Sequence, residues 1–124
     1  MIKGLGNDIL EIARLDSTLE RLGDKFVERI LTPEERCGYQ QSKQPGRFLA
    51  KRFCVKEACA KALGTGIGRG VSWQHMTVTH DDFGKPLLLL SAGAIERMSE
   101  LGAQAVHVSL SDEQHYVLAT VIIE

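Results

Sequence analysis

The chain has 124 residues, of which 44% are hydrophobic and 25% charged, and its formal net charge is -1 at pH 7. This length fits one domain, residues 1–124, with one hydrophobic core, and the near-neutral charge argues against the basic field that nucleic-acid-binding proteins use. No apolar run reaches the length of a membrane span and the first residues do not resemble a signal peptide, so we expect neither a nucleic-acid nor a membrane partner.

Helical patterns fill the first half of the chain. A strand that runs into a bend is predicted at residues 2–12, where apolar residues alternate with glycines. Across residues 16–31, apolar residues recur at spacings of three and four, which predicts an amphipathic helix, or two helices broken near Gly23. Thr32 and Pro33, followed by two acidic residues, are typical of the start of a further helix.

The longest predicted helix covers residues 47–63, after Gln44, Pro45 and Gly46 have ended the helix before it. A loop with four glycines follows at residues 64–70.

Strand patterns dominate the second half. We expect strands at residues 71–82 and 85–91 and a helix that Ser91 caps and Gly102 ends. A final hairpin is predicted from strands at residues 105–112 and 115–124. Helices followed by antiparallel strands indicate an α+β fold, with an antiparallel sheet packed against a long buried helix.

The cysteines give no metal or disulfide motif. Cys37, Cys54 and Cys59 contain no CxxC spacing and cannot all pair. Because Cys54 and Cys59 lie within one predicted helix, we expect them to be buried thiols in a reducing, cytoplasmic protein.

Charged residues stand out within the long predicted helix. Glu57 and Lys61 are four residues apart and lie on one helix face, where the ordinary interpretation is a surface ion pair. Their neighbours, however, are apolar nearly all round, which is typical of a buried helix. Charged residues on such a helix need a partner, a metal or a ligand.

Asp8 and the glycine loop extend this pattern. Asp8 follows Gly4 and Gly6 at a strand end, where it either stabilises a turn or binds an ion. Asp8 with Glu57 would supply the few oxygen ligands that Mg²⁺ takes from proteins. The loop is neither a Walker loop nor a dinucleotide fingerprint, but next to Lys61 its glycines would let a phosphate approach the backbone.

Three segments resemble the holo-[acyl-carrier-protein] synthase family, the small bacterial 4′-phosphopantetheinyl transferases. They are GLGNDILEIARL at residues 4–15, RFCVKEACAKALGTGIG at 52–68 and HVSLSDEQHYVLATVIIE at 107–124, and VSWQHMTVTHDDFGKPLL between them also fits. The resemblance implies transfer of the phosphopantetheine arm of coenzyme A to a serine of apo acyl carrier protein, in support of fatty acid biosynthesis. It also implies a homotrimer with each active site in a cleft between protomers.

The same resemblance assigns residues. Asp8 and Glu57 match the metal ligands for Mg²⁺, and Lys61 matches the lysine that contacts the pyrophosphate; these three form the expected catalytic set. The remaining coenzyme A contacts are expected from the basic and polar positions Lys43, Arg52, Gly64, His107 and Ser109. For the 3′-phosphate, Lys43 and Arg47 stay open as alternatives, and His107 has the alternative of an ordinary half-buried strand residue. His75, His80 and His115 are given no role, nor is Asp112.

Carrier recognition needs a local basic surface, because acyl carrier proteins are acidic and this chain is not basic overall. Arg14 lies in the first matching segment and is the first candidate, Arg21 is the second, and Lys25 is the weakest. The alternative is a solvated face of mixed charge.

Two matters of chemistry stay open. The serine proton passes to Glu57 or to a metal-bound water, and we favour the water because a carboxylate that binds a cation is a poorer base. Two other classes of protein fit the same residues: a metal-dependent pyrophosphohydrolase, and a non-catalytic trimeric module that binds coenzyme A or a carrier protein.

Overall fold

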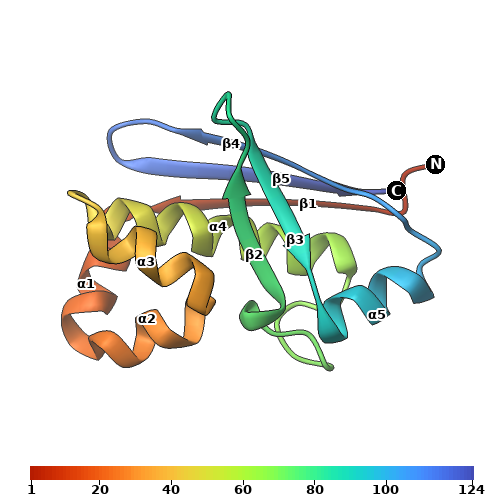
Figure 1. Ribbon diagram of the computed structural model, residues 1–124, viewed down its shortest axis with the longest axis horizontal. Coiled ribbons are helices and arrows are strands. Elements are labelled where there is room, and N and C mark those ends of the chain that lie inside the picture. The colour runs from red at the N-terminus through yellow and green to blue at the C-terminus, as the bar shows by residue number, and fades with distance from the viewer.

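A three-stranded antiparallel sheet forms one layer of the molecule. The computed structural model describes all residues, 1–124. Strands β1 (Gly4–Glu11), β5 (Tyr116–Ile123) and β4 (Val106–Asp112) lie in the order β1-β5-β4, and Figure 1 shows them side by side. The first and last strands of the chain are thus neighbours, with Asp8 opposite Ala119. Together with the helices this confirms the predicted α+β class.

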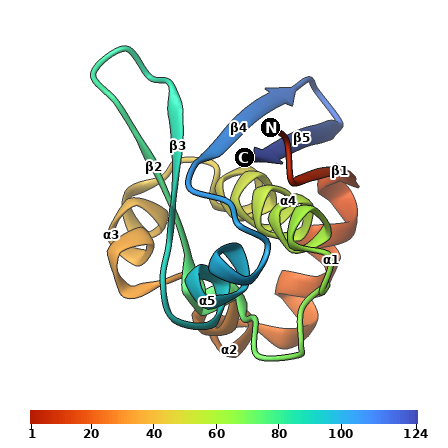
Figure 2. The same cartoon turned by 90° about the vertical axis from the view of Figure 1, so that its right-hand side faces the viewer.

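Helix α4 (Pro45–Leu63) packs along one face of this sheet. The residues of β5 that face it are apolar and fully buried: Val117, Ala119, Val121 and Ile123. Figures 1 and 2 show α4 between the sheet and the other helices. The helix begins two residues earlier than predicted, because Pro45 opens it: proline needs no amide hydrogen at the first helical position.

Strand β1 approaches α4 without side chains between them. A Cβ atom at Gly6 would lie 1.8 Å from the Ala58 carbonyl oxygen, and one at Gly4 would lie 2.0 Å from that of Ala62. Only glycine fits at such a distance, so the two backbones meet directly. Asp8 continues the same strand face, which carries its side chain to the helix surface.

The predicted helix pair before residue 32 is confirmed. Helix α1 (Ile12–Leu22) and α2 (Asp24–Ile30) are separated by Gly23, whose φ of 64° is left-handed. Helix α3 (Pro33–Gln41) follows Thr32, as its start signals predicted. These three helices gather at one end of α4 (Figure 1).

The remaining elements form a separate ribbon and a short helix. Strands β2 (Met76–His80) and β3 (Pro86–Leu90) pair as a two-stranded sheet that projects from the body in Figure 2. The strand expected from residue 71 starts later, because residues Trp73–His75 form the short 3₁₀ helix η1. Helix α5 (Ala92–Glu100) follows, but the Ser91 side chain makes no capping hydrogen bond.

The prediction that Cys54 and Cys59 are buried thiols is confirmed. Cys54 and Cys59 are buried on α4, whereas Cys37 is exposed. Helix α3 turns Glu35 toward α4 and leaves Cys37, two residues later, on its solvent side. No helix in the structure has the length and hydrophobicity that a membrane crossing requires.

Candidate active site

Asp8 and Lys61 meet where β1 crosses α4. The Lys61 Nζ lies 3.0 Å from the Asp8 Oδ1 and also donates to the Asn7 carbonyl oxygen at 2.9 Å. The Lys61 side chain is 55% exposed and the Asp8 side chain 18% exposed. The ammonium group therefore has donor capacity left for a ligand from solvent.

Glu57 lies one turn before Lys61 and lines the same hollow as Asp8. This hollow also contains Arg14, Phe26 and Phe53, together with Ile9, Leu10, Leu15 and Thr18. Partial burial of Glu57 raises its pKa, and the negative charge of Asp8 raises it further, while Lys61 and Trp73 act in the opposite direction. The Asp8 and Glu57 carboxylates therefore lie in one hollow that is partly shielded from water.

These two carboxylates fit a Mg²⁺ ion. The negative charge of Asp8 is one cause of the raised Glu57 pKa, so the two acids repel each other in the absence of a cation. Mg²⁺ takes oxygen ligands and commonly has only one or two carboxylates from the protein, with water and phosphate at its other positions. No group of three or more His, Cys, Asp or Glu side chains in the structure is placed to hold a metal ion.

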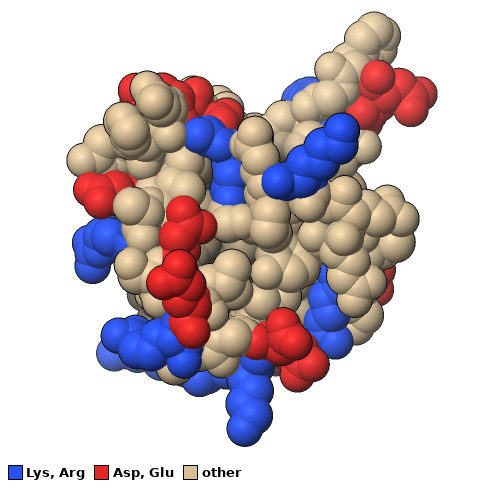
Figure 3. All heavy atoms as spheres, turned by 90° about the vertical axis from the view of Figure 1, so that its left-hand side faces the viewer, with Lys and Arg blue, Asp and Glu red and all other residues tan.

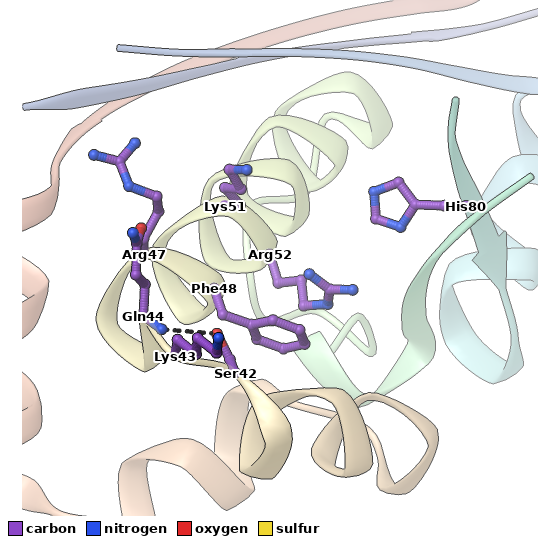
Figure 4. A pocket seen from close by; sticks show the side chains of 8 residues that line it. All are labelled: Ser42, Lys43, Gln44, Arg47, Phe48, Lys51, Arg52 and His80. Atoms are coloured by element: carbon purple, nitrogen blue, oxygen red, sulfur yellow. Dashed lines mark hydrogen bonds between the residues drawn. The ribbon is translucent and has the colours of Figure 1, made fainter. Parts of the chain in front are cut away.

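A basic pocket of about 320 Å³ lies toward the other end of α4 (Figure 4). Its lining residues come from the α3–α4 connection, from α4 and from β2: Ser42, Lys43, Gln44, Arg47, Phe48, Lys51, Arg52 and His80. The Arg52 guanidinium carbon stands 3.7 Å from the centre of the Phe48 ring. Burial lowers the pKa of His80, and the positive charges of Arg52 and Lys51 lower it further.

Arg47 and Lys43 differ in what they contact. The Arg47 guanidinium donates to Asp112 Oδ2 at 2.7 Å and to the backbone carbonyl oxygens of Glu113 and Gln114, each at 2.9 Å. Lys43 makes no salt bridge and is exposed. Of the two alternatives for the 3′-phosphate, Lys43 is therefore the one whose charge is free.

His107 and Ser109 lie elsewhere. Both are exposed residues of β4, alternate with residues that face α4, and pair across the sheet with Ile122 and Thr120 of β5. They therefore lie on the sheet face opposite α4, whereas Asp8 lies on the α4 side. Within one chain the structure does not bring them to Asp8. The His107 Nε2 lies 2.6 Å from the Glu124 Oε2.

Gly64 ends α4 just beyond Lys61. Its φ of 76° is left-handed and its amide donates to the Lys61 carbonyl oxygen, so the first role of this glycine is to terminate the helix. Gly66, Gly68 and Gly70 also have positive φ. The Arg97 Nε of α5 donates to the Leu63 carbonyl oxygen at 2.9 Å and holds this helix end in place.

Arg14 and Arg21 are exposed on α1 and form no salt bridge. Arg14 also lines the hollow that contains Asp8 and Glu57. Figure 3 shows that the end of the molecule formed by the first helices carries both acidic and basic side chains. The surface is thus mixed in charge, and Lys25 and Arg29 of α2, like the two arginines, form no salt bridge on it.

Sequence reasoning missed the partner of Lys56. The Lys56 side chain is fully buried, and its Nζ contacts Glu35 Oε1 at 2.6 Å and the Ile30 carbonyl oxygen at 2.5 Å. Glu35 also accepts hydrogen bonds from Thr32 and from the Val78 amide, and its Oε2 is 3.8 Å from Arg52 Nε. This pair joins α3, α4 and β2. The charge of Lys56 in an apolar helix signalled a buried partner, but nothing identified Glu35.

Comparison with known proteins connects this arrangement to a family. The sequence model of the 4′-phosphopantetheinyl transferase superfamily matches residues 4–121. The chain is 55% identical over 124 residues to a holo-[acyl-carrier-protein] synthase of Vibrio cholerae, covering 100% of this chain and 98% of that protein. It is 53% identical over 123 residues to the synthase of Shewanella frigidimarina, covering 99% and 98%.

Solved structures agree. The holo-[acyl-carrier-protein] synthase of Neisseria meningitidis superposes with a TM-score of 0.94 at 42% identity and covers 100% of this chain and 99% of that one. The Helicobacter pylori synthase, solved in complex with coenzyme A, gives a TM-score of 0.84 at 32% identity, with coverage of 97% and 99%.

Proposed function

Because the chain belongs to the 4′-phosphopantetheinyl transferase superfamily, we propose how its own residues carry out the reaction of that family. The enzyme transfers the 4′-phosphopantetheine arm of coenzyme A to a serine hydroxyl of apo acyl carrier protein and releases adenosine 3′,5′-bisphosphate. The observation that carries the assignment of roles is the meeting of Asp8, Glu57 and Lys61 at one place, which brings together two carboxylates and one ammonium group with one donor left free.

Asp8 and Glu57 would hold Mg²⁺, and the bound ion supplies charge stabilisation for the pyrophosphate oxygens. Lys61 donates to the same pyrophosphate, because its ammonium group is half exposed and already directed to this place by Asp8 and the Asn7 carbonyl. Phosphoryl-type transfer needs mainly positioning and charge stabilisation, and both are available from groups fixed on β1 and α4.

The basic pocket is the proposed site for the 3′-phosphate end of coenzyme A. Lys43 and Arg52 provide positive charge there, and Phe48 holds the Arg52 guanidinium from below. The Arg52 Nε is buried 3.8 Å from Glu35 Oε2, but no hydrogen bond uses the two terminal nitrogens of its guanidinium, so a phosphate oxygen would find those donors free. Gly64 would contact coenzyme A through its backbone.

Arg14 is the proposed first contact for the acyl carrier protein, with Arg21 along the same helix. Both are exposed and free of acidic partners, so they are available to an acidic surface. Arg14 also borders the hollow of Asp8 and Glu57, which would place a docked carrier beside the reacting groups.

A homotrimer with shared sites is supported by the uncovered sheet face. Leu5 and Ile9 are each 64% exposed on β1, and Tyr116 and Leu118 of β5 are exposed beside them. Apolar residues gathered on an open sheet face are typical of an interface. His107 and Ser109 lie on this same face, so they would reach the active site of a neighbouring protomer and not that of their own chain.

We also place the enzyme in the cytoplasm. Three free cysteines, one of them exposed, are compatible with a reducing compartment.

One assay tests the reaction and separates the other classes. The protein is incubated with coenzyme A, Mg²⁺ and an apo carrier protein, and the carrier is weighed by mass spectrometry. Transfer adds the phosphopantetheine mass to the carrier. Consumption of coenzyme A without a carrier would instead reveal a pyrophosphohydrolase, and binding without any change of mass would reveal a non-catalytic module.

The carrier surface has its own experiment. Arg14→Glu should raise the Michaelis constant for the carrier while that for coenzyme A holds, and added salt should weaken the wild-type complex more than the variant. An unchanged carrier constant would move the docking surface elsewhere. An equal rise in both constants would indicate a damaged fold.

Shared sites predict complementation. Asp8→Asn and His107→Ala chains should each have low activity alone, and mixing them with exchange of subunits should restore part of it, because some sites then combine an intact Asp8 with an intact His107. If both residues acted within one chain, the mixture would remain as inactive as its components. Sedimentation equilibrium on the wild-type protein should report a trimer.

A further inference from the structure

The four cations of the basic pocket are not equally available. Asp112, at the end of β4, contacts two of them with its two carboxylate oxygens. Its Oδ2 lies 2.7 Å from Arg47 Nη1, and its Oδ1 lies 3.6 Å from Lys51 Nζ. Lys43 has no acidic partner, and Arg52 is 3.8 Å from a carboxylate that is already bound to Lys56. An acid from the far end of the sequence thus neutralises one half of the pocket.

The charge of Asp112 can be removed without moving the Arg47 side chain that it contacts. Arg47 donates to the Glu113 and Gln114 carbonyl oxygens in addition to Asp112, so the hairpin between β4 and β5 would hold its guanidinium even without the carboxylate charge. In Figure 4 Arg47 and Lys51 point away from Phe48, whereas Arg52 lies over the Phe48 ring on the side of His80. An uncharged side chain of the same shape at position 112 would leave this arrangement in place.

We propose that Asp112 is an internal counter-ion that weakens the binding of phosphate groups in the basic pocket. This inference rests on the proposed function, since it assumes that the 3′-phosphate of coenzyme A enters this pocket. A phosphate there has to share Arg47 and Lys51 with a carboxylate that is always present. The affinity of the pocket is therefore lower than its four cations alone would give.

Weaker binding of phosphate in this pocket is useful because the substrate and the product carry the same 3′-phosphate group. Coenzyme A and adenosine 3′,5′-bisphosphate both present a 3′-phosphate, so contacts to it bind the two alike and do not favour the transition state. Tighter binding of that phosphate would slow the release of the product. The counter-ion limits this uniform binding at Arg47 and Lys51, while Lys43 keeps a charge without an acidic partner to attract the ligand.

Binding of adenosine 3′,5′-bisphosphate to the whole protein, measured by titration calorimetry, tests the proposal. Asp112→Asn removes the charge and keeps an oxygen that accepts from Arg47. At low ionic strength its dissociation constant should be roughly three- to tenfold lower than that of the wild type, because one negative charge near the phosphate is gone. At about 1 M salt, where the screening length is about 3 Å, the two constants should converge.

Two further variants control for the change. Glu96→Gln alters the net charge equally on α5, where Glu96 is exposed and unpaired, and should bind as the wild type does. Asp112→Glu keeps the charge and should also stay near the wild-type constant.

The outcomes divide cleanly. Tighter binding by Asp112→Asn alone, lost in high salt, supports the counter-ion. Equal or weaker binding by Asp112→Asn overturns it, and weaker binding would mean that Asp112 orients Arg47 for the ligand. If an Arg52→Gln variant binds adenosine 3′,5′-bisphosphate as tightly as the wild type does, the phosphate does not enter this pocket and the inference fails. The transferase activity of the wild-type protein would still stand.

Discussion

Helix α4 carries two lysine–carboxylate pairs of opposite character. Lys56 is fully buried against Glu35, and both Glu35 carboxylate oxygens accept hydrogen bonds, from Lys56, the Thr32 amide and the Val78 amide. Lys61, five residues later, meets Asp8 with its side chain 55% exposed. The chemistry of the two pairs is the same, and the surroundings differ.

The difference separates a structural contact from a reactive one. A buried pair is closed to solvent, so its charged groups are not accessible to a ligand. A half-exposed pair with free donors stabilises the fold little and can exchange its partner for a substrate. Four changes test this contrast, from the largest expected effect to the smallest.

Removal of a carboxylate charge at the proposed Mg²⁺ site beside the exposed pair should have the largest effect. Asp8→Asn and Glu57→Gln should each reduce transfer roughly thousandfold, because the loss of ion-mediated charge stabilisation is worth several kcal/mol. Steady-state rates at limiting Mg²⁺ measure this, with thermal unfolding as the check on the fold. A variant that keeps nearly the wild-type rate would show that the metal ligands are assigned wrongly.

Disruption of the buried pair should act on stability. Lys56→Met leaves Glu35 charged and buried without its ammonium partner, so we expect the free energy of unfolding to fall by about 3–5 kcal/mol. Urea denaturation gives the value. The double variant Glu35→Gln/Lys56→Met removes both charges and should be less destabilised than Lys56→Met; if the two are equal, the charge pair is not what holds α3 to α4.

The matched substitution at the exposed lysine should lower the rate of transfer and leave the stability of the fold nearly unchanged. Lys61→Met should change the free energy of unfolding by about 1 kcal/mol or less. It should lower the rate about a hundredfold, because one donor to the developing charge is lost. The same two measurements on Lys56→Met and Lys61→Met make the comparison direct. A large loss of stability in Lys61→Met would show that the exposed pair is as structural as the buried pair.

The smallest effect concerns the thiols. Cys37 is exposed and should react at once with a thiol reagent, whereas Cys54 and Cys59 are buried and burial raises the pKa of each to about 12. Both should react only as the protein opens. The Cys54 Sγ lies 3.3 Å from the Asp8 carbonyl oxygen, so its labelling rate, read by mass spectrometry, reports separation of β1 from α4. Rapid labelling of Cys54 would mean that this contact opens readily.

Much of the active site was predictable because its signals are local. Glu57 and Lys61 are one helical turn apart, and apolar neighbours on the same helix mark them as unusual. Asp8 follows two glycines that the strand needs for its approach to α4. The matching segments also lie in these places, so resemblance and residue chemistry point to the same side chains.

The rest depends on packing that no short segment encodes. Glu35 and Lys56 are 21 residues apart and meet only because α3 folds back onto α4. Exposure of Cys37 follows from the same rotation of α3. Alternation in β4 shows that His107 and Ser109 share a face, but which face α4 covers is decided by the whole sheet. The contact of Asp112 with Arg47 spans 65 residues and was equally invisible.

The direct meeting of β1 and α4 has a consequence for how this enzyme tolerates change over time. Most of the core consists of side chains that can be exchanged for others of similar volume with local adjustment. At Gly4 and Gly6 the nearest atoms of α4 are backbone atoms, which side-chain substitutions in the helix do not change, so the spacing between Asp8 and the helix does not depend on which side chains fill the surrounding core. The contact between β1 and α4 cannot widen gradually, however. A single methyl group added at Gly4 or Gly6 would force β1 away from α4, and Asp8 would move away from Glu57 and Lys61 at the same time.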